Sequence, residues 1–233
     1  MSETRASAIV IGTGAIGQAL VAQLQSRYSQ VLALGRRSDP AIDFEDEASI
    51  EAAAQWSAGQ CESAAAPLRL LLVSSGFLHG AAGQPERSLK ELQPGYLAHS
   101  FWVNAIGPAL LMKHFLPLLP RQGLSKAVFL SARVGSIEDN RLGGWYGYRA
   151  AKAALNQLVK TASIEQSRRN KQSLVLALHP GTVDSPLSAP FGKSGLDVRS
   201  PAVAAEQIVQ VIEALGAQDT GGFVDYRGEP VPW

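Results

Sequence analysis

Short apolar runs alternate along the chain with longer stretches in which apolar residues recur every three or four positions. The runs predict buried strands at 8–11, 31–34, 68–73, 127–130, 174–178 and 223–224, with a further short strand just before Asp43. The longer stretches predict helices at 16–24, 47–58, 96–118, 146–167 and 201–215. Strands that alternate with helices in this way favour a doubly wound α/β fold with a mostly parallel, seven-stranded sheet and helices on both faces.

Length and charge narrow the class of protein. The chain has 233 residues, which suits a single domain spanning 1–233. Its 21 Lys and Arg residues nearly balance its 20 Asp and Glu residues, and the net charge of +1 argues against binding to nucleic acid or to a membrane surface. Cys61 is the single cysteine and the four histidines are scattered, so we expect neither a disulfide nor a metal site. With no secretory signal and no apolar stretch of about twenty residues, the sequence predicts a soluble, cytoplasmic protein.

A glycine-rich turn follows the first predicted strand and leads into a helix. It has the pattern G-x-G-x-x-G, formed by Gly12, Gly14 and Gly17, with Thr13 and Ile16 among the intervening residues. Glycines let the backbone turn tightly and approach a pyrophosphate, which binds the free N–H groups and the positive dipole end of the helix. Between a strand and a helix the motif indicates a dinucleotide site, and the alternative is a tight turn with incidental glycines.

The residues after the second predicted strand bear on which dinucleotide is bound. An acidic residue there binds the ribose 2′-hydroxyl of NAD, whereas an arginine accommodates the 2′-phosphate of NADP. Arg36 and Arg37 occupy this place, so the sequence favours NADP(H). Asp39 is close enough in the sequence to keep NAD(H) as an alternative cofactor. The two arginines could also belong to a solvated loop that binds no nucleotide.

Tyr148 and Lys152 are the residues best suited to chemistry. They are four positions apart on the helix predicted at 146–167, so both lie on one helix face. A positive charge beside a phenol favours the phenolate and lowers the tyrosine pKa from its usual value of about 10. Tyr148 could then give a proton to a carbonyl oxygen or take one from an alcohol. The pair alone is weakly specific, because such pairs are also common on solvated helix faces.

The helix predicted at 96–118 contains a proline. Pro108 has no N–H group, so the carbonyl of Asn104 loses its helical hydrogen-bond donor and could hold a water molecule. The side-chain amide of Asn104 lies beside that carbonyl. The alternative interpretation is a kinked helix that belongs only to the core.

Several of these features lie just past the ends of predicted strands. They are Gly12, Ser75, Ser131 and Pro180, and the helix that carries Tyr148 begins on the same side. Ligands of a parallel α/β sheet bind outside the carboxyl ends of its strands. The separate features therefore indicate one crevice in a Rossmann-type fold.

In the order and separation of these motifs, the chain resembles the short-chain dehydrogenase/reductase family over essentially its whole length. The segments 130–137, 143–146, 178–183 and 228–233 are more narrowly similar to its C-factor and sniffer-like carbonyl reductase branch. The resemblance implies hydride transfer between a nicotinamide and a carbonyl or alcohol. Tyr148 would be the acid/base, Lys152 would lower its pKa and bind the nicotinamide ribose, and Asn104 would hold a relay water. The further cofactor contacts that it implies are Asp43, Ser75, Gly76, Pro180, Gly181, Val183 and Ser185.

The chain departs from the family pattern at the serine that would orient the substrate oxygen. Ala132 stands where that serine is expected. We assign the role to the neighbouring Ser131, because a backbone turn at the frayed strand end could redirect its side chain, and Ser136 is the substitute. The glycine motif is also one residue shorter than usual, and Ser74-Ser75-Gly76 replaces the family's Asn-Asn-Ala-Gly.

The sequence thus predicts an NADP(H)-dependent oxidoreductase that acts on a small carbonyl or alcohol substrate. The alternative is a nucleotide-binding signalling protein with little turnover, which the C-factor resemblance and Ala132 favour. We expect the loop at about 186–200 and the segment 137–144 to line the substrate pocket. The resemblance also implies a homodimer or homotetramer assembled through the helices at 96–118 and 146–167.

Overall fold

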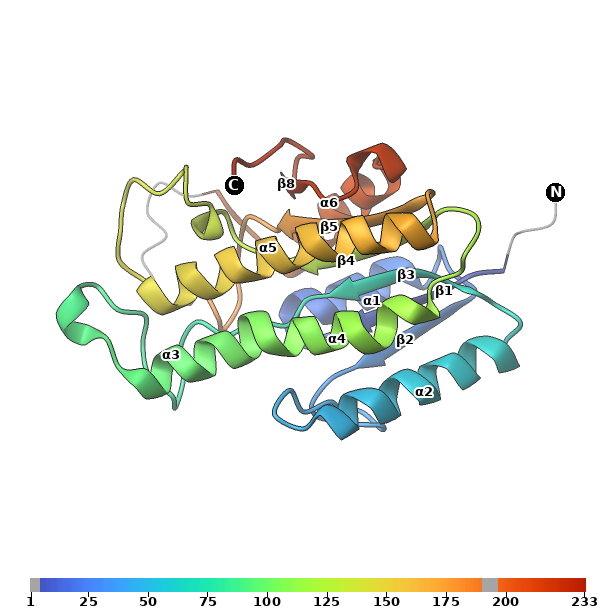
Figure 1. The fold of residues 1–233 in the computed structure, drawn as a ribbon, viewed down its shortest axis with the longest axis horizontal. Coiled ribbons are helices and arrows are strands. Elements are labelled where there is room, and N and C mark those ends of the chain that lie inside the picture. The colour runs from blue at the N-terminus through green and yellow to red at the C-terminus, as the bar shows by residue number, and fades with distance from the viewer. Residues whose placement is uncertain (1–4, 190–196) are drawn as a thin grey trace.

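The computed structural model describes residues 5–189 and 197–233, and Figure 1 shows their fold. Its centre is a six-stranded sheet in the order β2-β1-β3-β4-β5-β8, in which all neighbouring strands are parallel. The strand order reverses between β1 and β3, and ligand crevices of such sheets form at this point. The strands are β1 (Ser7–Ile11), β2 (Gln30–Leu34), β3 (Leu68–Val73), β4 (Ser125–Leu130), β5 (Ser173–His179) and β8 (Phe223–Asp225).

Helices cover both faces of the sheet (Figure 1). On one face lie α1 (Ala15–Leu24) and α6 (Pro201–Ala214), and on the other lie α2 (Glu47–Ser63), α3 (Pro94–Phe101), α4 (Gly107–Phe115) and α5 (Tyr146–Arg169). The sheet has a hydrophobic core on each face, and alternate residues of β1 pack into one or the other. Ala8 and Val10 pack with α1 and α6, whereas Ile9 and Ile11 pack with α2, α4 and α5. The predicted α/β architecture with helices on both faces is confirmed. Over the described ranges, no helix is both long and apolar enough to cross a bilayer.

The prediction of seven strands was wrong, because the strand expected before Asp43 does not form. The segment after β2 folds back on itself instead. The Ile42 N–H donates to the Gly35 carbonyl at 3.0 Å, and Ser38 Oγ lies within hydrogen-bond distance of the Gly35 and Pro40 carbonyls. Pro40 has no N–H to give to a strand ladder. Ile42 is buried all the same, so this segment contributes to the core as a loop.

The single helix expected at 96–118 is interrupted. A π-helical turn spans Trp102–Ile106 between α3 and α4, and a 3₁₀ turn follows at Leu116–Leu118. The Gly107 N–H donates to the Trp102 carbonyl, and the helix then continues through Pro108 at the start of α4. Asn104 lies inside the π turn and is fully buried. Single π turns within helices frequently occur at functional sites.

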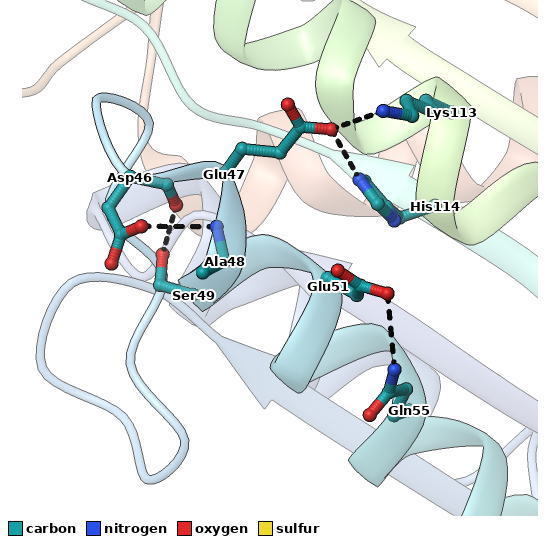
Figure 2. A network of polar contacts seen from close by, with 8 residues as sticks. All are labelled: Asp46, Glu47, Ala48, Ser49, Glu51, Gln55, Lys113 and His114. Atoms are coloured by element: carbon teal, nitrogen blue, oxygen red, sulfur yellow. Dashed lines mark hydrogen bonds and ion pairs between the residues drawn. The ribbon is translucent and has the colours of Figure 1, made fainter.

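Polar contacts join the start of α2 to α4, as Figure 2 shows. Glu47 accepts hydrogen bonds from Lys113 and His114, with 2.9 Å between Glu47 Oε1 and His114 Nε2. Exposed ion pairs of this kind add little net stability. Phe44, in the loop before α2, also packs on α4, because a Cβ added at Gly107 would lie 2.3 Å from Cγ of its ring. The absence of a side chain at Gly107 therefore lets the Phe44 ring lie directly against the backbone of α4.

The chain after β5 forms a small second sheet. β6 (Thr182–Val183) pairs in parallel with β7 (Val198–Arg199). β6 precedes the loop predicted at about 186–200 and β7 lies near its end, so the end of that loop returns to its beginning. Residues 190–196 of the predicted loop lie outside the described residues.

Candidate active site

The first turns of α5 carry Tyr148 and Lys152 to the carboxyl end of β4. Lys152 Nζ donates a hydrogen bond of 3.0 Å to the carbonyl of Leu130, the last residue of β4. The same nitrogen lies 5.9 Å from the centre of the Tyr148 ring. Both side chains are buried, with 7% of Tyr148 and 2% of Lys152 exposed. The helical spacing therefore places an amine beside a phenol ring in one buried site.

Burial changes the ionisation of both groups. It raises the pKa of the Tyr148 hydroxyl above its ordinary value and lowers the pKa of Lys152 to about 8, because both charged forms lose contact with water. The sequence predicted the opposite direction for Tyr148. Burial sets the direction of the shift, and the nitrogen of Lys152 is bonded to the Leu130 carbonyl beside the ring. Tyr148 is consequently protonated at neutral pH, which is the form that can donate a proton.

The loop after β3 brings Asn104 and Gly76 to the same place. Asn104 Oδ1 accepts from the Phe77 N–H at 3.0 Å, and Asn104 Nδ2 donates to the Phe77 carbonyl at 2.8 Å. A Cβ added at Gly76 would lie 3.6 Å from Asn104 Oδ1 and 3.9 Å from Lys152 Nζ, so the three residues are neighbours. The side-chain amide of Asn104 is thus used to hold this loop. The side-chain amide is therefore not free for the water-binding role predicted for Asn104.

Ser131 lies at the end of β4, and its side chain is directed toward α5. The Ser131 N–H donates to the Leu178 carbonyl at 2.8 Å, so the strand ladder continues through this residue. Ser131 Oγ donates to Asn156 Oδ1 at 2.6 Å, one helical turn beyond Lys152. The backbone turn expected at the frayed strand end begins after Ser131, in the 3₁₀ turn Arg133–Gly135.

Ser136, the substitute for Ser131, is bonded within its own loop and to the C-terminal segment. Its Oγ accepts from the Asp139 N–H at 3.0 Å and donates to the Trp233 carbonyl at 3.3 Å. Ala132 has an extended backbone, with φ −146°, and provides only a methyl group. Both candidate serines therefore use their hydroxyl groups in contacts that hold neighbouring segments.

The glycine turn after β1 has the form that a pyrophosphate needs. Gly12 has φ 110°, which favours glycine, and a Cβ there would lie 2.7 Å from a main-chain nitrogen of the loop after β3. A Cβ at Gly17 would lie 1.7 Å from the Gly12 carbonyl oxygen, so α1 packs directly on the turn. At Gly14 the same space is open, and no side chain caps the first N–H groups of α1. Thr13 borders the turn, and Ile16 packs against the core behind it. The free N–H groups of α1 are therefore accessible to a phosphate.

The residues expected around the adenosine lie beyond the ends of β2 and β3. Arg36 and Arg37 are exposed directly after β2. Ser75 has a buried hydroxyl with no hydrogen-bond partner in the described chain, which leaves it available to a ligand. Asp43 is exposed, and its carboxylate accepts from the Glu45 N–H at 3.0 Å. Asp43 thus also shapes the turn that leads into α2.

Past β5 the chain turns at Pro180 and Gly181. Gly181 has φ 76°, and a Cβ there would lie 1.9 Å from Arg199 Nη2, so the turn packs tightly against β7. Val183 is buried in β6, and Ser185 is partly exposed after it. Because β4 and β5 are parallel neighbours, this turn and Tyr148 both lie at the carboxyl ends of the strands.

Two residues near Tyr148 were missed by reasoning from the sequence. Glu86, in the loop before α3, accepts a hydrogen bond from the Gly147 N–H at 3.1 Å and is 2% exposed. Tyr96, on α3, donates to the Leu78 carbonyl at 2.8 Å and is also buried. Tyr96 could have been found as one more apolar position on its helix. Glu86 gives no such indication, because a lone carboxylate in an irregular loop is ordinarily solvated.

A parallel sheet with a glycine turn at its switch point and an accessible helix N-terminus defines an α/β protein of the Rossmann class. A family model described as short chain dehydrogenase matches residues 6–195. The protein belongs to the short-chain dehydrogenase/reductase family.

Individual relatives agree with this assignment. The chain is 34% identical to the C-signal of Myxococcus xanthus over 138 residues, which cover 59% of this chain and 78% of that protein. It is 23% identical to an uncharacterized oxidoreductase of Schizosaccharomyces pombe, over 95% of both chains. Among solved structures, the carbonyl reductase Sniffer of D. melanogaster has a TM-score of 0.84 at 23% identity, over 98% of this chain and 100% of that one. An NADPH-bound carbonyl reductase from chicken fatty liver has a TM-score of 0.81 at 22% identity, with the same coverage. The predicted likeness to C-factor and sniffer-like proteins is confirmed.

Proposed function

We propose that this protein transfers a hydride between NADP(H) and a small carbonyl or alcohol. The observation that carries the proposal is the buried pair of Tyr148 and Lys152. The pair lies beside Gly76 at the carboxyl ends of the strands, where the glycine turn also lies. The purified protein, mixed with NADPH and a panel of aldehydes, ketones and quinones, should consume NADPH with some members of the panel. Tight NADPH binding without consumption across the panel would contradict the proposal.

The residues present fit a dinucleotide. The accessible N-terminus of α1, with Gly12 and Gly14, would hold the pyrophosphate, and the unpartnered hydroxyl of Ser75 would contact the adenosine side. NADPH, when bound, supplies the hydride at its nicotinamide ring. The proposed contacts of the nicotinamide half are Gly76, Tyr148, Lys152, Pro180, Gly181, Val183 and Ser185. Structural relatives that hold bound NADPH or NADP support this choice of cofactor.

Tyr148 donates the proton that the carbonyl oxygen takes up on reduction. The hydroxyl carries its proton at neutral pH, because burial raises its pKa above the ordinary value, which is already well above 7, so it can act as the acid in the direction of reduction. The ammonium of Lys152 stabilises the phenolate that remains after the proton has left. The main-chain carbonyl of Asn104, in the π turn, would hold the water through which the proton is replaced. In the reverse direction, the phenolate takes the proton of an alcohol as the hydride leaves its carbon.

Replacing Arg36 and Arg37 with alanine should weaken NADPH binding and leave NADH binding unchanged. Both guanidinium groups are exposed after β2, where they can pair with the 2′-phosphate that NADH lacks. A hydrogen bond to a charged group contributes about 1.5–3 kcal/mol, so the Kd for NADPH should rise by about 10²-fold. Calorimetric titration with both dinucleotides measures the effect. Arg121→Ala, an exposed change at the opposite edge of the sheet, is the control. A wild-type preference for NADH would instead point to Asp39.

Ser131→Ala should lower turnover by about tenfold, the usual effect of losing one hydrogen bond, while Ser136→Ala should leave turnover unchanged. Ser131 bonds to Asn156 one helical turn beyond Lys152, whereas Ser136 bonds to its own loop and to Trp233. Steady-state kinetics of the two purified variants decide the matter. If Ser136→Ala removes activity and Ser131→Ala does not, the two assignments must be exchanged.

A second candidate function is nucleotide-dependent signalling with little turnover. The identity of 34% to the C-signal of Myxococcus xanthus and the alanine at position 132 favour it. In that case NADPH binds without being consumed, and Tyr148→Phe leaves the cellular phenotype unchanged.

We further propose a cytoplasmic homodimer or homotetramer that assembles through the helices around α4 and α5. Ile106 in the π turn and Ile164 on α5 expose 37% and 50% of their surfaces, which supplies apolar area for such contacts. Sedimentation of the purified protein measures the number of subunits.

A further inference from the structure

The loop that precedes α3 reaches the first turn of α5. Glu86 in this loop accepts two hydrogen bonds there, one at its main-chain carbonyl from the Trp145 N–H and one at Oε2 from the Gly147 N–H at 3.1 Å. The first N–H groups of a helix have no partner within the helix. Trp145, which precedes α5, offers no side-chain cap. Glu86 therefore caps α5 from a segment 61 residues away from Gly147.

The contact between Glu86 and this turn is close and fully buried. A Cβ added at Gly147 would lie 3.1 Å from Glu86 Oε1, and 3.0 Å from both Tyr96 and Leu97. Glu86 Oε1 is buried and has no hydrogen-bond partner among residues 5–189 and 197–233. Burying a carboxylate with an unpartnered oxygen costs stability, which the positive dipole end of α5 offsets only in part. The hydrogen bond that the described structure gives this carboxylate is therefore the one to the first turn of α5.

The turn that Glu86 holds determines the position of Tyr148. Trp145 has φ 53° and ψ 41°, a left-handed conformation that is strained for a bulky residue. The centre of its indole ring lies 6.3 Å from that of the Tyr148 ring, at an interplanar angle of 72°. Arg149 binds the main-chain carbonyls of Gly143 and Gly144 just ahead of Trp145. Two residues thus hold the strained turn that leads into α5. Glu86 accepts hydrogen bonds from the N–H groups of the turn, and Arg149 donates to its carbonyls.

We infer that Glu86 is a positioning residue for Tyr148. Its carboxylate fixes the first turn of α5, and with it the Trp145 indole against the Tyr148 phenol. A small displacement of a reacting group reduces turnover strongly, so a side chain that never touches the substrate can still control the rate. The expected effect on turnover rests on the proposed function, whereas the expected effect on the structure of the turn does not.

Hydrogen exchange of the amides at 145–148 measures this positioning without any assay of activity. In Glu86→Ala, protection of these amides should fall by about tenfold, while protection in the later turns of α5 stays at the wild-type level. Glu86→Gln keeps an oxygen acceptor for the Gly147 N–H, so most of the protection should return. Glu91→Ala is the matched control, because Glu91 lies in the same part of the chain. Its carboxylate accepts a hydrogen bond from the Arg87 N–H and none from α5.

Kinetics of the same variants separate positioning from a general loss of structure. Glu86→Ala should lower kcat by about tenfold without changing the KM for NADPH. Glu86→Gln should recover kcat and should melt no lower than the wild type, because it no longer buries a charge. If Glu86→Ala does not fold, Glu86→Asp replaces it, since the shorter side chain keeps the charge but withdraws it from the Gly147 N–H.

Wild-type protection at 145–148 in Glu86→Ala would overturn the proposal. A fall in protection spread over the whole chain, with a lower Tm that Glu86→Gln does not restore, would overturn it as well, because it would show a purely structural role. If the wild-type protein shows no carbonyl turnover, the proposed function fails, and the exchange measurements still decide whether Glu86 positions the turn.

Discussion

Replacing Tyr148 with phenylalanine is expected to lower carbonyl turnover by about 10³-fold while leaving the affinity for NADPH unchanged. Phenylalanine keeps the ring that packs near Trp145 and removes only the hydroxyl, which is the proposed proton donor. Steady-state kinetics measure the turnover, and a fluorescence titration measures the affinity. Tyr146→Phe is the matched control, because Tyr146 lies in the same helical turn with 37% of its surface exposed.

Full turnover in Tyr148→Phe would contradict the role given to this hydroxyl. Equal losses in Tyr148→Phe and Tyr146→Phe would contradict it too, because they would indicate a disturbance of the helical turn and not the removal of one proton donor.

Replacing Lys152 with methionine is expected to lower turnover by about 10²-fold and to remove a pH dependence. The pKa of Lys152 is about 8, so the wild-type ammonium loses its proton as the pH rises through this value. Reductive turnover should fall over the same range, because only the charged amine stabilises the phenolate left after proton donation. Methionine has a similar length and removes a buried charge, so the Tm should not fall. Pre-steady-state rates across this pH range test the expectation.

Lys160→Met serves as the control for this change, since Lys160 lies further along α5 and is exposed. It should keep both the wild-type rate and the fall in rate near pH 8. If Lys152→Met shows that same fall, the titration belongs to another group and the pairing of Lys152 with Tyr148 is wrong.

The elements that could be predicted are those set by local pattern. β3 spans Leu68–Val73 as expected, because a strand buried on both faces is a continuous apolar run. α5 begins at Tyr146 as expected and continues to Arg169, since its apolar spacing marks the buried face. The strand expected before Asp43 failed because Ile42 is buried by the packing of a loop, and burial of one residue does not make a ladder.

The candidate site could be predicted only as far as one helix or turn holds it. Tyr148 and Lys152 share a face because helical geometry alone brings them together. The partners of Asn104 and Ser131 lie 27 and 25 residues away, and that of Glu86 lies 61 residues away, so the packing of separate segments decides them. The pKa of Tyr148 depends in the same way on how deeply α5 is buried, which its spacing to Lys152 does not reveal.

Transfer of deuterium from labelled NADPH to a carbonyl substrate tests the central claim most directly. NADPH carrying deuterium at its hydride-donating position would be incubated with the protein and a responsive aldehyde or ketone, and the alcohol would be analysed by mass spectrometry. The account predicts an alcohol labelled on its carbinol carbon with the wild-type protein, and almost none in the same time with Tyr148→Phe. An alcohol formed without the label, or bound NADPH that never transfers it, would contradict the account.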